Sequence, residues 1–361
     1  MSTHTTKPVV LVDGRLARRR RTGIARVVNE TQGAMRRKPP DDLEVVWLQG
    51  PPALPRRNVL TSIGNLILDL VWLNIALPAI ARRRKAALIH VPMNWGPLAA
   101  PCPTVVTIQD LAFERMPQAY PAGFRRYASF VGRRCATRAR LVIATTNAGA
   151  RDVEQIYRVP ESRIRVVNLG ARPDTQAPRE REPFILAVGE FEPRKRVLDL
   201  MRGHAQYFAS APLDPPLCRL VVAGSGGSEE AAARRLQGPG CDMVGFVDDD
   251  DLAEYYRRAT MFVSLSAYEG FGLPIAEAMA RGCPVMVADN SSQAEVAGDA
   301  AILVTDVSPD GLAQTLTDAL ADRTALAARG EAARDRAAEL SWDATARRTL
   351  DVWREALGMP R

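Results

Sequence analysis

Histidine and cysteine are scarce in this chain of 361 residues. The three histidines (His4, His90 and His204) are far apart, and the five cysteines include no Cys-x-x-Cys pair. These patterns argue against a zinc site and against a disulfide framework, and they favour a reducing, cytoplasmic location. A structural role is favoured for His90, with a place in an acceptor pocket as the alternative. The first residues contain no long apolar stretch, so we expect no signal peptide.

No apolar run reads as an ordinary membrane span. The longest, residues 59–81, contains two asparagines, Asp69 and Pro78, and four basic residues follow it at 82–85. A spanning helix needs about 20 residues nearly free of charge, so we expect no transmembrane helix here. A largely buried helix is favoured, and a helix lying in the plane of a membrane surface is the alternative.

Acidic residues are few in the first half of the chain. Residues 1–180 carry 29 lysines and arginines against 13 acidic residues, whereas residues 181–361 carry 19 against 28. A basic half indicates an anionic partner, such as a lipid surface, a phosphate-bearing substrate or nucleic acid. Because no binding motif with interleaved aromatics is present, nucleic acid is not expected. The alternative is a solvated surface in an arginine-rich chain.

Short apolar runs alternate with segments of helical periodicity along the whole chain. This alternation predicts βαβ units and parallel sheets, so the expected fold class is α/β. The runs lie at residues 8–13, 43–48, 87–91, 104–109, 141–145, 163–168, 184–189, 219–224, 242–247, 260–265 and 284–289.

Two Rossmann-like, doubly wound domains are therefore predicted. They would span residues 1–172 and 173–340, and a helix would follow at 341–361. Residues 170–183 are rich in Pro, Arg and Glu and are the expected linker. Ligands of such domains bind beyond the carboxyl ends of the strands.

The segment Ser264–Glu277 carries the densest chemical signal. A buried strand is followed by Glu269, a glycine turn and a helix that Pro274 should open. Amides at the start of that helix can bind an anion. The two carboxylates of the segment, Glu269 before the helix and Glu277 in its first turn, can accept hydrogen bonds from hydroxyls. A sugar nucleotide carries both kinds of group. The alternative is a glycine-rich turn with a capping carboxylate.

Three cations follow the strand that ends at Gly189. Arg194, Lys195 and Arg196 should open a helix, where cations oppose the macrodipole unless an anion is bound. Lys195 is the only lysine after residue 85. An ammonium that reaches a diphosphate is the functional interpretation, and a solvated basic turn is the alternative.

The segments GEFEPRK and EGFGLPIAE resemble those of glycosyltransferase family 4. In the first half, DGRLARRRRTGIARVV, HVPMNWGP and VTIQDLAF are also similar to that family. The resemblance covers nearly the whole chain, is closest to the bacterial mannosyltransferase-like branch, and implies the GT-B fold, whose carboxyl-terminal helix crosses back to the first domain. A catalytically degenerate GT-B binding protein and a GT-B sugar-nucleotide epimerase are the alternatives.

The activity that this resemblance implies is retaining transfer of a hexosyl group, mannosyl among the candidates. The donor would be a nucleoside diphosphate sugar, and neither a cofactor nor a metal would be required. The acceptor hydroxyl would belong to a saccharide, a lipid-linked saccharide or a natural product.

Residue roles follow from the resemblance. Glu269 would contact the transferred sugar, Glu277 would bind the ribose hydroxyls, and Arg194 and Lys195 would neutralise the leaving diphosphate. The other donor contacts would be Gly189, Phe246, Val247, Phe271, Gly272 and Leu273. Thr22, Gly23 and Asp110 would form the acceptor and diphosphate loop. Gln109 stands where the family usually has histidine, and its amide can bind a hydroxyl but cannot act as an acid or a base.

Two clusters of like charge remain. The aspartates at 248–251 are expected to cap a helix rather than bind a metal. The basic clusters at 18–21 and 82–85 favour an anionic, lipid-linked acceptor or a peripheral position on the anionic inner face of a membrane. A soluble acceptor is the alternative.

Overall fold

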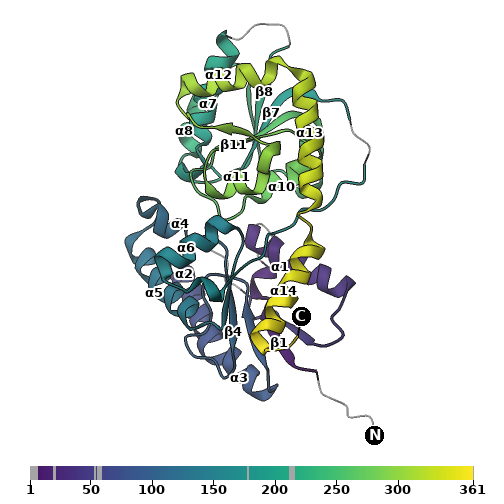
Figure 1. Ribbon diagram of the computed structural model, residues 1–361. Coiled ribbons are helices and arrows are strands. Elements are labelled where there is room, and N and C mark those ends of the chain that lie inside the picture. The colour runs from purple at the N-terminus through teal and green to yellow at the C-terminus, as the bar shows by residue number, and fades with distance from the viewer. Residues whose placement is uncertain are drawn as a thin grey trace. The chain divides into compact units, whose positions relative to one another are not determined.

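The chain forms two compact units in the computed structural model. The structure describes residues 7–18, 22–52, 54, 59–176, 179–210 and 216–360. Unit 1 comprises residues 1–169 with 342–361, and unit 2 comprises residues 170–341 (Figure 1). The chain therefore passes between the units twice, close to the boundaries expected at 172 and 340.

Unit 1 is built on a parallel sheet of six strands in the order β2-β1-β3-β4-β5-β6. The strands are β1 (Val9–Asp13), β2 (Glu44–Leu48), β3 (Leu88–Val91), β4 (Thr104–Ile108), β5 (Leu141–Ala144) and β6 (Ile164–Val166). β1 and β3–β5 are buried almost throughout, which explains why their sequences are continuously apolar.

Helices cover both faces of this sheet. They are α1 (Gly23–Arg37), α2 (Val59–Val71), the π-helical turn η2 (Trp72–Ala76), α3 (Leu77–Arg83), α4 (Ala112–Arg115), α5 (Ala122–Arg138), α6 (Asn147–Tyr157) and α14 (Trp342–Leu357). Short 3₁₀ turns are η1 (Arg15–Arg18), η3 (Pro117–Ala119) and η4 (Glu161–Arg163). The last helix of the chain, α14, packs on α1 within unit 1, and Arg354 on it pairs with Asp42 at 2.8 Å.

Unit 2 repeats the architecture with the strand order β12-β11-β10-β7-β8-β9. Its strands are β7 (Glu182–Val188), β8 (Arg219–Ala223), β9 (Cys241–Gly245), β10 (Ala259–Ser264), β11 (Val285–Ala288) and β12 (Ile302–Val304). Its helices are α7 (Val197–Ser210), α8 (Glu230–Leu236), α9 (Asp249–Arg258), α10 (Leu273–Ala280), α11 (Ser291–Ala297), α12 (Pro309–Ala321) and α13 (Arg323–Ala338), with the 3₁₀ turns η5 (Pro193–Lys195) and η6 (Gly298–Ala300).

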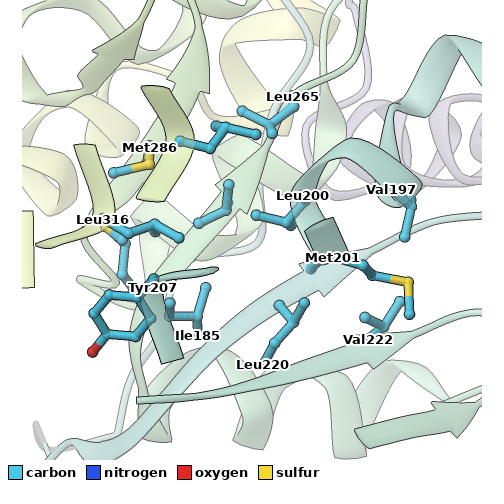
Figure 2. Packing of buried hydrophobic residues seen from close by; sticks show 14 of the residues in the cluster. Ile185, Val197, Leu200, Met201, Tyr207, Leu220, Val222, Leu265, Met286 and Leu316 are labelled. Atoms are coloured by element: carbon cyan, nitrogen blue, oxygen red, sulfur yellow. The ribbon is translucent and has the colours of Figure 1, made fainter. Parts of the chain in front are cut away.

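One hydrophobic core cluster of unit 2 lies between the sheet and helices α7 and α12. Figure 2 shows Leu200 and Met201 of α7 among Ile185, Leu220 and other strand side chains. Each buried aliphatic side chain of this kind contributes about 1.5–3 kcal/mol to folding. This layer fixes the strands, and their carboxyl ends carry the candidate site.

The α/β prediction is confirmed: all eleven predicted runs contain strands, and both sheets are parallel. The strand β12 was not predicted, because it has only three residues and one of them, Leu303, is 45% exposed. The hydrophobic pattern of a strand cannot be recognised in so short a segment.

The expected linker at 170–183 is fastened to unit 2 along its described part. Asp174, whose side chain is 8% exposed, pairs with Arg257 at 2.8 Å. Arg181 donates hydrogen bonds to the carbonyl oxygens of Tyr256 and Ala259. The Pro- and Arg-rich composition therefore marks a packed segment with specific polar contacts, and β7 begins inside it at Glu182.

The apolar segment at 59–81 is helical, but it is not largely buried as expected. By length and composition Gly64–Arg83 could cross a membrane, with a mean hydropathy of 1.6, and 28% of it is buried inside the protein. One side, with Leu73 and Leu77, packs on Leu11 and Ile89 of the sheet. The other side is exposed, so this helix is half-buried.

His90 lies inside unit 1, in agreement with a structural role. Its ring is 4% exposed, hydrogen-bonds Thr107 through Nε2 at 2.9 Å and packs edge-on against Trp353. Burial lowers the pKa of His90 from 6.5 to about 3. The folded state therefore keeps this imidazole neutral at pH values where the unfolded chain binds a proton.

We predict that His90→Gln weakens the loss of stability in acid. Between pH 6.5 and about 3 the unfolded chain binds one proton more than the folded chain at this site, so stability falls as pH falls. The slope from one such group is at most about 1.4 kcal/mol per pH unit. Urea unfolding between pH 4 and 7 measures it. Thr107→Val, which removes the hydrogen bond but keeps the imidazole, should retain the slope; equal slopes in wild type and His90→Gln would refute the assignment.

Candidate donor site

The loops after three neighbouring strands of unit 2 are joined at the carboxyl edge of its sheet. The amide of Gly189 donates to the carbonyl of Ala223 at 3.0 Å, and the amide of Gly224 donates to the carbonyl of Gly245 at 2.7 Å. A Cβ on Gly224 would lie 1.9 Å from the carbonyl oxygen of Gly189, so only glycine fits. Close backbone packing therefore fixes the floor of the site.

Two cations and one carboxylate meet above this floor. Lys195 Nζ lies 2.5 Å from Glu269 Oε1, and Arg194 Nη1 lies 3.2 Å from the same oxygen. The side chains of Lys195, Arg194 and Glu269 are 18%, 26% and 16% exposed. Burial alone would raise the pKa of Glu269, but the charges of Lys195 and Arg194 outweigh it and the pKa is lowered. The two cations therefore favour the carboxylate form of Glu269.

The cations do not open a helix as predicted. Arg194 and Lys195 lie in the 3₁₀ turn η5, Arg196 follows in the left-handed region with φ 52°, and α7 begins only at Val197. The amide of Ala267 donates to the carbonyl of Arg194 at 2.7 Å, which joins this turn to the loop that carries Glu269. Arg194 and Lys195 therefore do not stand in the first turn of an α-helix as expected, and both pair with Glu269 inside the protein.

A buried amide network supports the loop between β10 and Glu269. Gln293 is 0% exposed; its Oε1 accepts from the Ser264 hydroxyl at 2.7 Å and its Nε2 donates to the Ser266 carbonyl at 2.6 Å. Asn290 donates to the same carbonyl, and Ser292 donates to the carbonyl of Glu269 at 2.6 Å. These three residues were not predicted from the sequence, although polar residues directly after a buried strand are a usable signal.

The glycine turn leads into α10 as expected, with a shift of one residue. Gly272 is the N-cap with φ 97°, α10 begins at Leu273, and Pro274 takes the second position rather than the first. Phe271 is 4% exposed, so its backbone and not its ring is open to a ligand. Glu277 is the fifth residue of the helix and 9% exposed, so it lies beyond the first turn in which we expected it.

Two further loops complete this edge of the sheet. The glycines at 224, 226 and 227 follow β8, and all three have positive φ. A Cβ on Gly227 would lie 2.4 Å from the carbonyl oxygen of Phe191, so this loop packs tightly on the loop that precedes Lys195. Sequence analysis did not single it out, although its glycine density after a buried strand was visible. Phe246, after β9, is 56% exposed and Val247 is half-buried.

The predicted residues of the first half lie in unit 1. Asn94 holds the end of β4: its Oδ1 accepts from the Gln109 amide at 2.8 Å and its Nδ2 donates to the Asp110 carbonyl at 2.7 Å. Gln109 Nε2 donates to the Pro92 carbonyl, and Asp110 Oδ1 accepts from the amide of Ala112. Asn94 was not singled out in sequence, and its side chain orients both predicted residues.

Thr22 and Gly23 form the start of α1. The Thr22 hydroxyl accepts from the amide of Ala25 at 3.2 Å and so caps the helix. Before them, Arg15 pairs with Asp13 at 3.2 Å and with Asp69 of α2 at 3.0 Å. The predicted basic cluster at 18–21 includes residues 19–21, which lie outside the described residues.

The aspartate run at 248–251 caps α9, as predicted. Asp248 Oδ1 accepts from the amides of Asp250 and Asp251 at 3.1 and 3.0 Å. Within the described residues, no group of three or more His, Cys, Asp or Glu side chains is arranged to hold a metal.

A separate hollow of about 480 Å³ lies at the opposite edge of the unit 2 sheet, beside Pro183 and Pro284 at the starts of β7 and β11. Its arginines donate to the chain itself: Arg323 bonds the Thr260 hydroxyl, and Arg181 bonds backbone carbonyls. Ligands of a doubly wound sheet bind beyond the carboxyl ends of the strands, whereas this hollow lies at their amino ends, so it is not the expected ligand site.

Comparison with protein families identifies both halves of the chain. Residues 21–175 match the model "Glycosyltransferase Family 4" and residues 172–336 match "Glycosyl transferases group 1". The chain belongs to the GT-B glycosyltransferases of the family 4 type.

Named relatives agree with this assignment. O-antigen chain mannosyltransferase B of Escherichia coli is 28% identical over 69% of this chain and 70% of its own length. D-inositol 3-phosphate glycosyltransferase 2 of Catenulispora acidiphila is 33% identical over 60% of this chain, and the match spans 56% of that relative.

Solved structures share the fold. Sucrose-phosphate synthase of Thermosynechococcus elongatus superposes with a TM-score of 0.71 at 19% identity, over 98% of this chain and 99% of that one. Anabaena HepE, solved in complex with UDP and glucose, gives a TM-score of 0.66 at 16% identity over 96% and 99% of the two chains. The GT-B fold predicted from the sequence is thus confirmed.

We predict that Gln293→Leu destabilises the protein by roughly 2–3 kcal/mol, because the Ser264 hydroxyl loses its buried acceptor and the Ser266 carbonyl loses one of the two amide groups that donate to it. Gln314→Leu is the matched control, since Gln314 is exposed on α12 and bonds Asp318 on the same helix. Urea unfolding of both full-length variants measures the difference. Equal midpoints for the two variants would show that the buried amide does not support the loop.

Proposed function

We propose that this protein is a retaining glycosyltransferase that moves a hexosyl group from a nucleoside diphosphate sugar to an acceptor hydroxyl. The observation that carries the proposal is the cluster of Lys195, Arg194 and Glu269 at the carboxyl edge of the unit 2 sheet. Family membership supports transfer, and the mannosyltransferase names of two relatives support a mannosyl group among the hexoses.

The charges of the cluster suit a diphosphate that is still attached to a sugar. Two cations share the Glu269 carboxylate, so two charged donors are held side by side at the site. A diphosphate would accept hydrogen bonds from Lys195 and Arg194, and the amides at the start of α10 would add a preorganised dipole. Glu269 would then accept hydrogen bonds from hydroxyls of the sugar. Its negative charge would face the sugar and not the phosphates.

In the reaction, the bond between the sugar C1 and the diphosphate oxygen breaks, and a bond from C1 to the acceptor oxygen forms on the same face. The acceptor proton passes to the departing phosphate oxygen, so the carboxylate does not have to act as a nucleophile. Lys195 and Arg194 stabilise the charge that develops on the leaving group. Because these side chains supply that charge, we propose that transfer requires no metal.

The remaining donor contacts are assigned from their places along the edge. Glu277 would bind the ribose hydroxyls, Phe246 and Val247 would border the base, and Gly189 would let the diphosphate approach the backbone beside Lys195. A Cβ on Gly189 would come within 3.8 Å of the Lys195 side chain.

The residues of unit 1 are proposed to serve the sugar and the acceptor. Gln109 donates through Nε2 to the Pro92 carbonyl, so its Oε1 is the atom assigned to a sugar hydroxyl. Thr22, Gly23 and Asp110 are assigned to the acceptor and diphosphate loop. The acceptor is a hydroxyl of a saccharide, a lipid-linked saccharide or a natural product.

We predict that Lys195→Ala lowers transfer by about 30- to 1,000-fold, roughly 2–4 kcal/mol of transition-state stabilisation, without unfolding the protein. Lys7→Ala, at an exposed lysine of unit 1, is the control. Turnover is measured with EDTA present, in which the wild type should remain active. Wild-type turnover in folded Lys195→Ala would reject the leaving-group role, and loss of wild-type transfer in EDTA that magnesium restores would reject metal independence.

Glu277→Ala should weaken binding of the nucleoside diphosphate, whereas Glu269→Ala should mainly slow transfer. The two effects differ because Glu277 is assigned to the ribose and Glu269 to the sugar. Calorimetric titration with the nucleoside diphosphate alone separates them, since that ligand carries the ribose but no transferred sugar. An unchanged diphosphate affinity in Glu277→Ala would contradict the ribose assignment.

A further inference from the structure

One helical face of unit 1 exposes large apolar side chains. Leu66, Ile67, Val71 and Ile75 on α2 and η2 are 42%, 54%, 46% and 64% exposed. Ile67, Val71 and Ile75 recur every four residues, which places them on one side of a helix. We call these three residues the apolar stripe. Soluble proteins rarely leave such a row in water, so the stripe indicates a contact surface.

Polar contacts fasten the opposite side of this helix to the sheet. Asp69 pairs with the buried Arg15 at 3.0 Å, and Trp72 Nε1 donates to Asp13 Oδ1 at 3.0 Å. Leu73, on the same side, is 2% exposed. Asp69, the charged residue within the apolar segment, therefore helps to fix this side of the helix against unit 1. The apolar stripe, on the other side, points outward.

The register of the sheet places α5 and α6 in the same helical layer as the helix that carries the apolar stripe. Val91 lies beside Val106, and Val106 lies beside Val142, so these three side chains are on one face. Val91 packs in the cluster beneath η2 and α3, whereas Val106 and Val142 pack in the cluster beneath α5 and α6. All these helices therefore cover one face of the sheet (Figure 1).

The outer side of this layer is basic. Arg82, Arg83, Arg84 and Lys85, at the end of α3, are all exposed. On α5, Phe130 is 65% exposed and borders a hollow of about 580 Å³. The charged residues that line the hollow are four arginines and one carboxylate: Arg125, Arg126, Arg133, Arg134 and Glu114. Apolar side chains that are flanked by cations are the pattern of a surface that enters the head-group region of an anionic bilayer.

We infer that this helical layer docks unit 1 on an anionic lipid surface. The apolar stripe enters the acyl boundary, the basic residues at 82–85 contact lipid phosphates, and the arginines around Phe130 receive further head groups. A second copy of this chain is the less suitable occupant, because it would bring the same cations against these ones. The inference concerns binding alone and does not depend on the proposed transfer.

Co-sedimentation of the full-length protein with vesicles tests this docking. Vesicles of neutral phosphatidylcholine are compared with vesicles containing phosphatidylglycerol, at low and high salt. One variant carries Ile67→Ser, Val71→Ser and Ile75→Ser, and Leu303→Ser, an exposed apolar position of unit 2, is its control. The second variant carries Arg82→Gln, Arg83→Gln and Arg84→Gln. Its control, with equal loss of charge, carries Arg202→Gln, Arg234→Gln and Arg235→Gln on unit 2.

Wild type should bind the anionic vesicles and be released by salt, and each unit 1 variant should lose about tenfold or more of its partitioning while the controls retain it. Urea midpoints establish that the variants are folded. Equal binding to both vesicle types, binding to neither, or equal losses in the controls would overturn the inference. So would protein that resists extraction by salt and alkaline carbonate, which indicates a span. Lipid-free dimers in sedimentation equilibrium that the serine variant abolishes would also overturn it, because a second copy would then cover the stripe.

Discussion

The site depends on one interaction, the sharing of the Glu269 carboxylate by Lys195 and Arg194. Lys195 and Arg194 both lie within 3.2 Å of Glu269 Oε1, at partly buried positions. Charged side chains that are withdrawn from water are stabilised by opposite charges and hydrogen bonds. Two cationic side chains in one turn are suited to an anionic ligand, and the negative charge of a diphosphate can bind both.

The rest of unit 2 holds this cluster in place. Lys195 is positioned by a 3₁₀ turn and a left-handed Arg196, and Glu269 is positioned by a loop whose carbonyls are bonded by Gln293, Asn290 and Ser292. Parallel strands bring both loops to the same edge, since β7 and β10 are neighbours in the sheet. Rigid support of this kind is what preorganised charge stabilisation requires.

Much of the fold could be predicted from the sequence, because buried parallel strands are continuous apolar runs. The site residues that could be predicted are those of a type that is unusual among their neighbours in the sequence, such as Lys195 and Glu269. The helix start at Arg194 was mispredicted because the left-handed conformation of Arg196 leaves no signature in residue type. The roles of Gln293 and Asn94 could not be predicted, since both amides bond backbone carbonyls that are remote in the chain.

The segment at 59–83 illustrates a second limit. Its composition is that of a buried helix, yet burial is decided by the neighbours on each side. On the outer side of α2 and η2 the described neighbours leave Ile67 and Ile75 exposed. The charge of Asp69 interrupts the apolar pattern without revealing that Arg15, which lies 54 residues earlier, is its partner.

The central claim is that unit 2 binds a nucleoside diphosphate through Lys195 and Arg194. A thermal-shift panel of nucleosides, nucleoside monophosphates, nucleoside diphosphates and their sugars tests it most directly, with wild type and Lys195→Ala compared. We expect the diphosphates and their sugars to stabilise the wild type by about 2.7 kcal/mol at 100 times their Kd, and to lose most of this effect in the variant. Stabilisation that is equal for nucleosides and diphosphates, or unchanged in Lys195→Ala, would contradict the account.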